Sequence, residues 1–239
     1  MRCAAFVLLL VAGTPAFAQH DDAQPGVSDM SGMQHHVGAV AFANSCAVEA
    51  QPEVLRGVGM LHSFWYSAGE QTFRAALAKD PGCAIADWGI AALMMNNPLA
   101  GVGATPSNTA KAQAALEHAR AIGASTQRER DYIEAVGAYY KDFASHTERE
   151  RQIGRSAAYE ALAAKYPDDE EAQIFSALYI AATQAQSDQT YSAYARATAI
   201  LEPMFRKNPN HPGVAHYLIH AYDAPPLAAK GLEAARAYS

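Results

Sequence analysis

Apolar residues recur with a helical period along most of the chain. From about residue 50 onward alanine is frequent and no strand-like alternation occurs. Four segments share one spacing: an aromatic residue or Leu follows the first residue by four positions, an apolar residue lies three further on, and a stop lies five later. These segments are Gly69-Phe73-Ala76-Pro81, Ala112-Leu116-Ala119-Ala124, Arg155-Tyr159-Leu162-Pro167 and Ala197-Leu201-Met204-Pro209. The stops lie 43, 43 and 42 residues apart, which predicts a structural repeat.

A second amphipathic pattern begins after each stop. The four stretches are CAIADWGIAALMM (83–95), TQRERDYIEAVGAYY (126–140), EEAQIFSALYIAA (170–182) and GVAHYLIHAYD (213–223). Small residues let the two helices of a pair approach closely, and the aromatic residue fills the groove between them. One pair cannot bury its apolar face alone, so the pairs have to stack. The pattern predicts an all-α, helical-repeat solenoid of antiparallel helix pairs without a sheet.

The spacing resembles the tetratricopeptide repeat (TPR). In the first repeat the agreement extends to Gly57 and Tyr66, which stand at the family's usual intervals before Gly69. Two departures are Arg155, where the family has a small residue, and Ala124, which replaces a proline. The period also exceeds the usual 34 residues, as it does in HEAT-like repeats, which are the structural alternative.

Five stretches resemble an uncharacterised group of exported bacterial TPR proteins. They are GVGMLHSFWY (57–66), DPGCAIADWGIA (80–91), RERDYIEAVGAYY (128–140), YPDDEEAQIFSALYI (166–180) and HPGVAHYLIHAYDAPPLAAKGLEAAR (211–236). Members of this group run much longer, and a histidine-rich segment of the type HMPSHI follows shortly after the point where this chain ends. Ala228-Leu232-Ala235 also begins another repeat. We therefore expect a TPR-like domain over residues 46–239 that is truncated at its C-terminus.

The first 18 residues have the features of a secretory signal peptide. Arg2 precedes the apolar run Ala4–Ala12, and Ala16-Phe17-Ala18 forms a small-residue cleavage site. Cleavage near Ala18 predicts a periplasmic or secreted protein. Residues 19–45 are polar and lack a period, which predicts a flexible leader. Within it, DMSGMQHH (29–36) is interpreted either as part of a disordered tail or as a cluster of soft-metal ligands.

Charge and hydropathy exclude two classes of partner. Without residues 1–18 the chain keeps 17 basic and 24 acidic side chains, so it offers no basic surface for nucleic acid. No later window is apolar enough to span a membrane. Phosphate-binding glycine loops, nucleophile elbows and paired CxxC motifs are also missing from the sequence.

Two cysteines follow the signal peptide, in a compartment that tolerates disulfides. Cys46 precedes the first helix of the first pair, and Cys83 opens the first helix of the second pair. Equivalent helices of a solenoid run side by side in the same direction, which places both cysteines at one end. We predict a Cys46–Cys83 disulfide; two separate buried thiols are the alternative.

The stretch HPGVAHYLIHAYDAPP (211–226) carries the candidate chemistry. A helix from about Pro212 to Asp223 would place His216, His220 and Asp223 on one face, at i, i+4 and i+7, directed towards the concave side. An HxxxH pair can bind zinc or a similar ion, and His211 is a further candidate ligand. No glutamate lies within the pair, which excludes the HExxH protease pattern. A metal or catalytic site, a ligand-contact surface and a structural polar stripe all remain open.

Other conspicuous residues have structural interpretations. His62 lies four repeats from His216, so only strong curvature of the solenoid would bring the two together, and a packing role is favoured. Trp88 and the run Leu93–Met95 have the spacing of core residues. Thr126 and Glu129 have the arrangement of a capping box.

The sequence predicts an exported scaffold or binding module for an extended peptide, an envelope protein or an assembly factor. The alternative is a metal-dependent enzyme, such as a hydrolase, with His216 and His220 as ligands. No cofactor is firmly implied, and a divalent metal in a longer protein belongs to the alternative. Residues that would complete the histidine face lie beyond Ser239, so we expect weak or no metal binding by residues 1–239.

Overall fold

The computed structural model describes residues 38–238, which form ten α-helices and no strand. The helices are α1 (Gln51–His62), α2 (Tyr66–Lys79), α3 (Ala84–Leu93), α4 (Pro106–Ile122), α5 (Gln127–Tyr140), α6 (Glu148–Lys165), α7 (Glu170–Ala181), α8 (Ser192–Lys207), α9 (Pro212–Ala221) and α10 (Leu232–Tyr238). Short 3-10 turns lie at Phe143–Ser145 and Ala228–Gly231. The all-α prediction is confirmed for these residues. The predicted signal peptide and the Met/His stretch lie outside the described residues.

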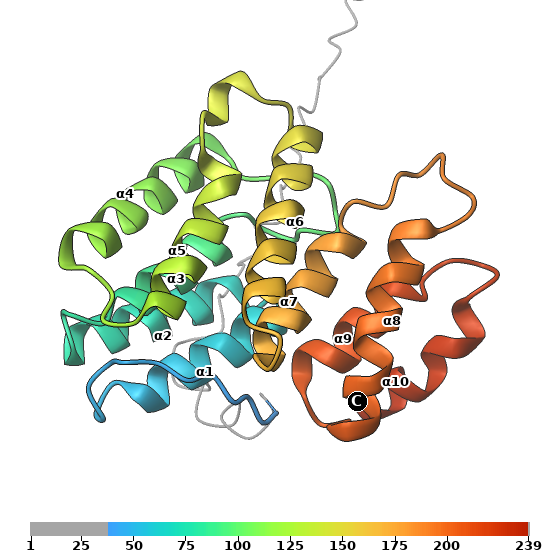
Figure 1. Ribbon diagram of the computed structural model, residues 1–239, viewed down its shortest axis with the longest axis horizontal. Coiled ribbons are helices and arrows are strands. Elements are labelled where there is room, and N and C mark those ends of the chain that lie inside the picture. The colour runs from blue at the N-terminus through green and yellow to red at the C-terminus, as the bar shows by residue number, and fades with distance from the viewer. Residues whose placement is uncertain (1–37, 239) are drawn as a thin grey trace, which may run out of the picture. The chain divides into compact units, whose positions relative to one another are not determined.

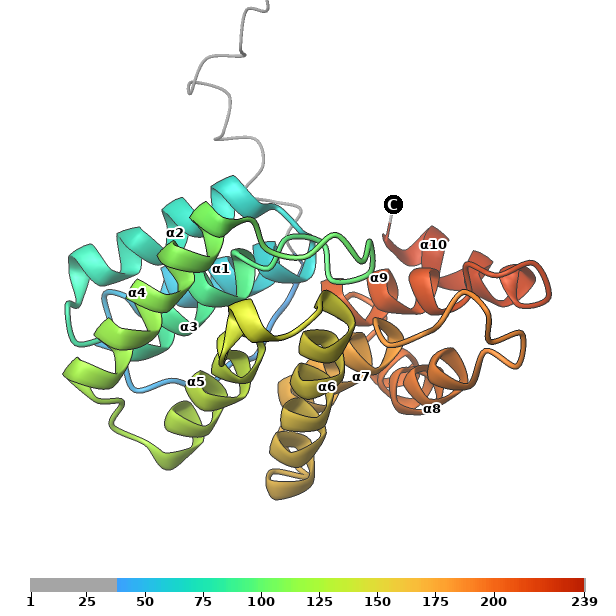
Figure 2. The same ribbon diagram turned by 90° about the horizontal axis from the view of Figure 1, so that it is seen from above.

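Consecutive helices pack in pairs. Helix α1 packs with α2, α3 with α4, α5 with α6, α7 with α8, and α9 with α10 (Figures 1 and 2). Each pair also contacts the next one, through α2 and α3, α4 and α5, α6 and α7, and α8 and α9. This is the helix–turn–helix order that the 42–43-residue spacing predicts. No helix in residues 38–238 is long and apolar enough to cross a membrane.

Local sequence sets the helix boundaries. The predicted capping box is present at the start of α5, where the Thr126 side chain accepts from the Glu129 N–H and the Glu129 carboxylate accepts from the Thr126 N–H. Thr147 and Glu150 form a second capping box at the start of α6. Gly123 ends α4 with φ +76°, a conformation that glycine adopts without steric cost.

The two helices of a pair differ sharply in burial. All ten residues of α3 are buried, whereas only five of the 17 residues of its partner α4 are. Helix α7 follows the pattern of α3, with ten buried residues out of 12. A helix that is apolar all round has to lie inside a core. The first helices are therefore inner helices, and the second helices cover them with one face.

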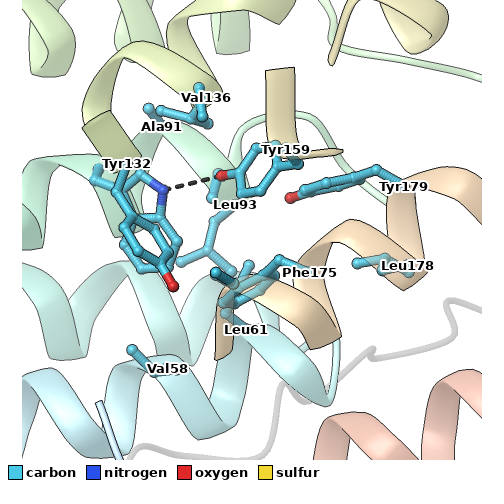
Figure 3. Close-up of a cluster of buried hydrophobic side chains, with 14 of the residues drawn as sticks. Val58, Leu61, Ala91, Leu93, Tyr132, Val136, Tyr159, Phe175, Leu178 and Tyr179 are labelled. Atoms are coloured by element: carbon cyan, nitrogen blue, oxygen red, sulfur yellow. Dashed lines mark hydrogen bonds between the residues drawn. The ribbon is translucent and has the colours of Figure 1, made fainter. Parts of the chain in front are cut away.

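Trp88 of α3 lies in the core of the inner helices. Its side chain is fully buried, and its indole N–H donates to the hydroxyl of Tyr159 at 3.0 Å. The rings of Tyr132 and Phe175 meet it edge to face, each with a centroid distance of 5.4 Å (Figure 3). Leu93–Met95 are also buried, so the prediction of core positions is confirmed. One aromatic cluster thus joins helices α3, α5, α6 and α7.

The inner helices also bring distant repeats together. Helix α1 contacts both its neighbour α3 and the distant helix α9. The His216 imidazole donates through Nδ1 to the backbone carbonyl of His62 at 2.7 Å. His62 and His216 therefore meet, which from the sequence alone required strong curvature, and the His62 side chain is buried, as its favoured packing role predicts. Glycine explains the close approach, because a side chain at Gly213 of α9 would overlap the ring of His62.

A disulfide joins Cys46 and Cys83, as the sequence predicts, with their Cα atoms 4.8 Å apart. Cys46 precedes α1 and Cys83 caps α3, so the bond joins the N-terminal ends of two adjacent inner helices. It closes a sequence separation of 37 residues. In the chain-entropy model a loop of this length stabilises the fold by about 3–4 kcal/mol.

Candidate functional site

Helix α9 carries the candidate histidines and is shorter than predicted. Pro212 occupies its first turn, and the side chain of His211 caps it by accepting the Val214 N–H at 3.3 Å. The helix ends at Ala221, before the residues that Pro225 and Pro226 restrict. Asp223 therefore lies beyond the helix and is exposed, so the prediction that it shares a helical face with His216 and His220 is wrong.

Three buried residues form a hydrogen-bonded network at the junction of α1, α7 and α9. His62 ends α1, Glu171 lies in the first turn of α7, and His211 caps α9. The Nε2 atoms of the two histidines lie 2.8 and 2.9 Å from the two oxygens of the Glu171 carboxylate. On the far side of the His62 ring, Nδ1 lies 2.9 Å from the hydroxyl of Tyr217. All three members are at most 5% exposed.

The hydrogen bonds fix the protonation of this network. Because Nδ1 of His211 accepts a backbone N–H, its proton is on Nε2, where it donates to Glu171. Burial lowers the pKa of His62 and favours its neutral form. Burial also raises the pKa of a carboxyl group, but for Glu171 the effect of His62 and His211 is larger and lowers its pKa to about 2. The network therefore contains an ionised carboxylate that neutral imidazoles solvate.

The donor atoms of His62, Glu171 and His211 lie within 4.8 Å of one another, which is close enough to surround a metal ion. A metal on Nε2 of His211 would force the ring proton to Nδ1, where it would oppose the Val214 N–H and remove the cap of α9. We therefore interpret the network as a set of hydrogen bonds that holds α1, α7 and α9 together, in preference to a metal centre. His211 points to Glu171, and the prediction that it joins the HxxxH ligands is not met by this arrangement.

His216 and His220 form a second, separate pair. Their Nε2 atoms face each other at 3.1 Å across one turn of α9. Nδ1 of His216 donates to the carbonyl of His62, so the Nε2 atom of its neutral ring carries a lone pair. His220 then donates from Nε2 to that lone pair. Burial lowers the pKa of His216 to about 4, which favours the neutral form of this ring at pH 7.

Aromatic rings cover the histidine pair. Phe64 lies 4.6 Å from the His216 ring, and Tyr238 stacks on the same ring at 5.1 Å. Phe64 has φ +57°, which is rare for a bulky residue, so the turn after α1 holds it in a strained conformation. The pair is half-buried. Next to the pair, Ser63, Trp65, His211, Ala215 and Tyr238 contribute to a pocket of about 420 Å³, and Tyr238 thus borders both.

An extended segment before α1 is the feature that the sequence did not reveal. Residues 38–45 (blue in Figures 1 and 2) were expected to belong to a flexible leader, yet they pack on the inner helices. Alternate side chains turn inward: Val40 is half-buried, Phe42 is 3% exposed and Cys46 forms the disulfide. This period of two is that of an extended strand. The alternation covers only residues 40–46, too few to stand out from the preceding polar residues.

Phe42 anchors the segment in an aromatic site. It stacks on Trp88 at 5.2 Å and meets the edge of Tyr132 at 5.3 Å. The guanidinium group of Arg128 lies 4.7 Å from the Phe42 ring centroid. The same arginine forms an ion pair with Asp169 at 2.6 Å, which holds it in place. The α5 and α7 termini thus shape a site for one aromatic side chain.

Polar groups hold the backbone of the segment. Arg128 donates to the Ala43 carbonyl at 2.6 Å, and Glu129 accepts the Ser45 N–H at 2.8 Å and the Ser45 hydroxyl at 2.6 Å. At the other end, the Cα atom of Gly38 lies so close to Pro212 and the Asn210 carbonyl that no side chain fits there. The segment 38–46, which we call the strap, therefore runs from the start of α9 to the starts of α5 and α3.

Comparison of the chain with protein-family models, curated proteins and solved structures gives no significant match. Glu171, the central acceptor of the buried network, was not predicted from the sequence. It stands beside Glu170 at the start of EEAQIFSALYI, and two adjacent acidic residues there are typical of the exposed first turn of a helix.

Proposed function

We propose that this chain is an exported, TPR-like binding module that holds extended polypeptide across the N-terminal ends of its inner helices. The observation that supports the proposal most is the strap, because it is an extended peptide seated on those ends. The site offers the two kinds of group that peptide recognition requires: a pocket for alternate side chains and partners for main-chain groups. The ligand would be a segment of an envelope protein or assembly factor.

The chemistry of the strap site defines the class of ligand. Trp88, Tyr132 and Arg128 favour an aromatic side chain at the position of Phe42. Arg128 and Glu129 bond to a carbonyl and an N–H group, which every peptide has. Ala41 and Ala43 border a depression of about 690 Å³ that larger side chains could fill. The preferred ligand is an extended segment with one aromatic residue and larger outward side chains than the strap has.

The strap competes with such a ligand. Its tether at Cys46 keeps it near the site, and a short tether corresponds to an effective concentration in the millimolar range. A peptide in solution has to displace Phe42 before it can bind. Replacement of Phe42 by alanine weakens the strap without removing any group of the site itself.

A binding titration tests the proposal. A fluorescent peptide with the sequence of residues 38–45, GAVAFANS, is added to the full chain, and its anisotropy is followed. We expect the Phe42→Ala chain to bind the peptide more tightly than the unaltered chain. A second substitution, Arg128→Ala, should abolish the gain, because it removes the group that holds the backbone carbonyl and covers the aromatic ring.

The controls separate binding from misfolding. Circular dichroism and cooperative urea unfolding show whether each variant is folded. Ser45→Ala loses only hydroxyl contact with Glu129, so it provides a milder release of the strap and should give a smaller gain. Equal affinity of all four chains, or no binding by any of them, would contradict the proposed function.

A further inference from the structure

We propose that His216 and His220 form a binding site for one divalent transition-metal ion of the Zn²⁺ type, with their Nε2 atoms as the two protein ligands, contrary to the sequence-based expectation of weak or no metal binding by residues 1–239. The site is independent of the strap and of the peptide-binding function. It differs also from the network of His62, Glu171 and His211, in which both ring nitrogens of each histidine bond to other residues: Tyr217, Glu171 and the Val214 N–H.

The distance between the two nitrogens fits a shared ion. Zinc binds imidazole nitrogen at about 2.0–2.1 Å in tetrahedral sites, which places two ligand nitrogens about 3.3 Å apart. The Nε2 atoms of His216 and His220 are 3.1 Å apart before any ion is present. An i, i+4 pair on a helix has a fixed backbone, so the two rings need little movement to bind.

His216 makes the kind of hydrogen bond that orients a metal-binding histidine. Histidines that bind metals commonly donate the other ring N–H to a carbonyl or carboxylate, which orients the ring and directs the lone pair at the ion. His216 does so at 2.7 Å to the carbonyl of His62. His220 has to transfer its proton from Nε2 to Nδ1, a change between two neutral tautomers.

The surroundings favour occupation by an ion. Phe64, held at φ +57°, covers the two rings from the side of α1 and limits their rotamers. The hydrogen bond from Nδ1 of His216 to the His62 carbonyl leaves the Nε2 lone pair for an ion. Asp223 lies beyond the end of α9, and no carboxylate of the described residues forms a three-ligand cluster with the pair. Two coordination positions therefore remain for water or for a ligand group.

Calorimetric titration of the metal-free full chain with Zn²⁺ tests the inference. We expect one ion per chain at this site and at least about a tenfold weaker affinity in His220→Ala, which removes one of the two ligands. His118→Ala is the matched control, because His118 is a histidine of α4 that pairs with Asp87 and lies elsewhere. His35→Ala combined with His36→Ala controls for metal binding by the Met/His stretch. Both controls should keep the affinity of the unaltered chain.

A second measurement locates the ion without relying on the stability of a variant. Long-range ¹H–¹⁵N correlation spectra report the protonation and ligation of each imidazole nitrogen. Addition of Zn²⁺ should shift the Nε2 resonances of His216 and His220 and leave Nε2 of His62 and His211 protonated. Unchanged Nε2 resonances at both His216 and His220, or an affinity that His220→Ala does not alter, would overturn the inference.

Discussion

At the scale of single residues, Gly213 controls how closely α9 approaches α1. A Cβ atom there would lie 2.4 Å from Nδ1 of His62, and the His62 ring is fully buried and hydrogen-bonded on both sides. Since neither the ring nor the helix can move freely, Gly213→Ala should lower the free energy of unfolding by about 1–3 kcal/mol. Urea denaturation followed by circular dichroism measures this change.

Gly154 is the matched control, because it also lies within a helix, α6, but has open space around it. Gly154→Ala should raise the free energy of unfolding by up to about 1 kcal/mol, since alanine loses less backbone entropy in a helix. Two substitutions of the same kind are thus expected to have opposite signs. A stabilising Gly213→Ala would show that α9 and α1 are not in close contact.

Some residues were predictable from the sequence and others were not. Cys46, Cys83 and the capping residues Thr126 and Glu129 follow local spacing rules, so their roles were visible. Arg155 was recognised only as a departure from the TPR pattern. It is 1% exposed, and its guanidinium lies 4.3 Å from the centroid of Tyr179. A charged residue in an amphipathic helix is normally predicted to be exposed. Arg155 is buried because aromatic side chains of another helix, such as Tyr179, pack against its guanidinium.

At the scale of helices, Glu171 ties the start of α7 to α1 and α9. Its pKa of about 2 lies below the ordinary value of 4.5, so its stabilising effect is complete above pH 4.5 and is lost as the pH falls towards 2. Between pH 5 and pH 3 this loss amounts to about 2 kcal/mol of unfolding free energy. Glu171→Gln should remove that part of the acid sensitivity.

The same substitution should destabilise the protein at pH 7. The glutamine amide has one acceptor oxygen, so one of the two imidazole N–H groups loses its partner, at a cost of about 1–3 kcal/mol. Glu134→Gln is the control, because Glu134 is an exposed carboxylate paired with Arg120 and should change stability by less than about 1 kcal/mol. Denaturant titrations at several pH values test both effects. If Glu171→Gln leaves the pH dependence unchanged, the buried network does not join the three helices.

The helices themselves were predictable, but the end of α9 and the ordered strap before α1 were not. Strong periodicity and the proline positions located each helix pair. Pro225 and Pro226 limited α9 without fixing its last turn, and the helix ends at Ala221, two residues earlier than expected. The strap has an alternation too short to be recognised, and its order comes from contacts with Trp88, Arg128 and Glu129, distant in the sequence.

At the scale of the described domain, the repeat spacing predicts which helix pairs are adjacent. It does not predict that the distant helices α1 and α9 are in contact. Each pair contacts the next, as a period of 42–43 residues requires. Helix α1 nevertheless contacts α9, and the spacing within single repeats does not encode this contact. The contact of α1 with α9 brings His62 close to Glu171, His211 and His216. The strap lies on the N-terminal ends of the inner helices.

Mapping the position of a bound peptide tests the central claim, that these ends hold an extended chain with an aromatic anchor. The peptide GAVAFANS, with photoreactive benzoylphenylalanine in place of the residue that corresponds to Phe42, is irradiated with the full Phe42→Ala chain. Mass spectrometry then identifies the cross-linked residues. We predict cross-links to the starts of α3 and α5, around Trp88 and Tyr132, which excess unlabelled peptide suppresses. Cross-links scattered over the outer helices, or none above the level of a scrambled peptide, would contradict the account.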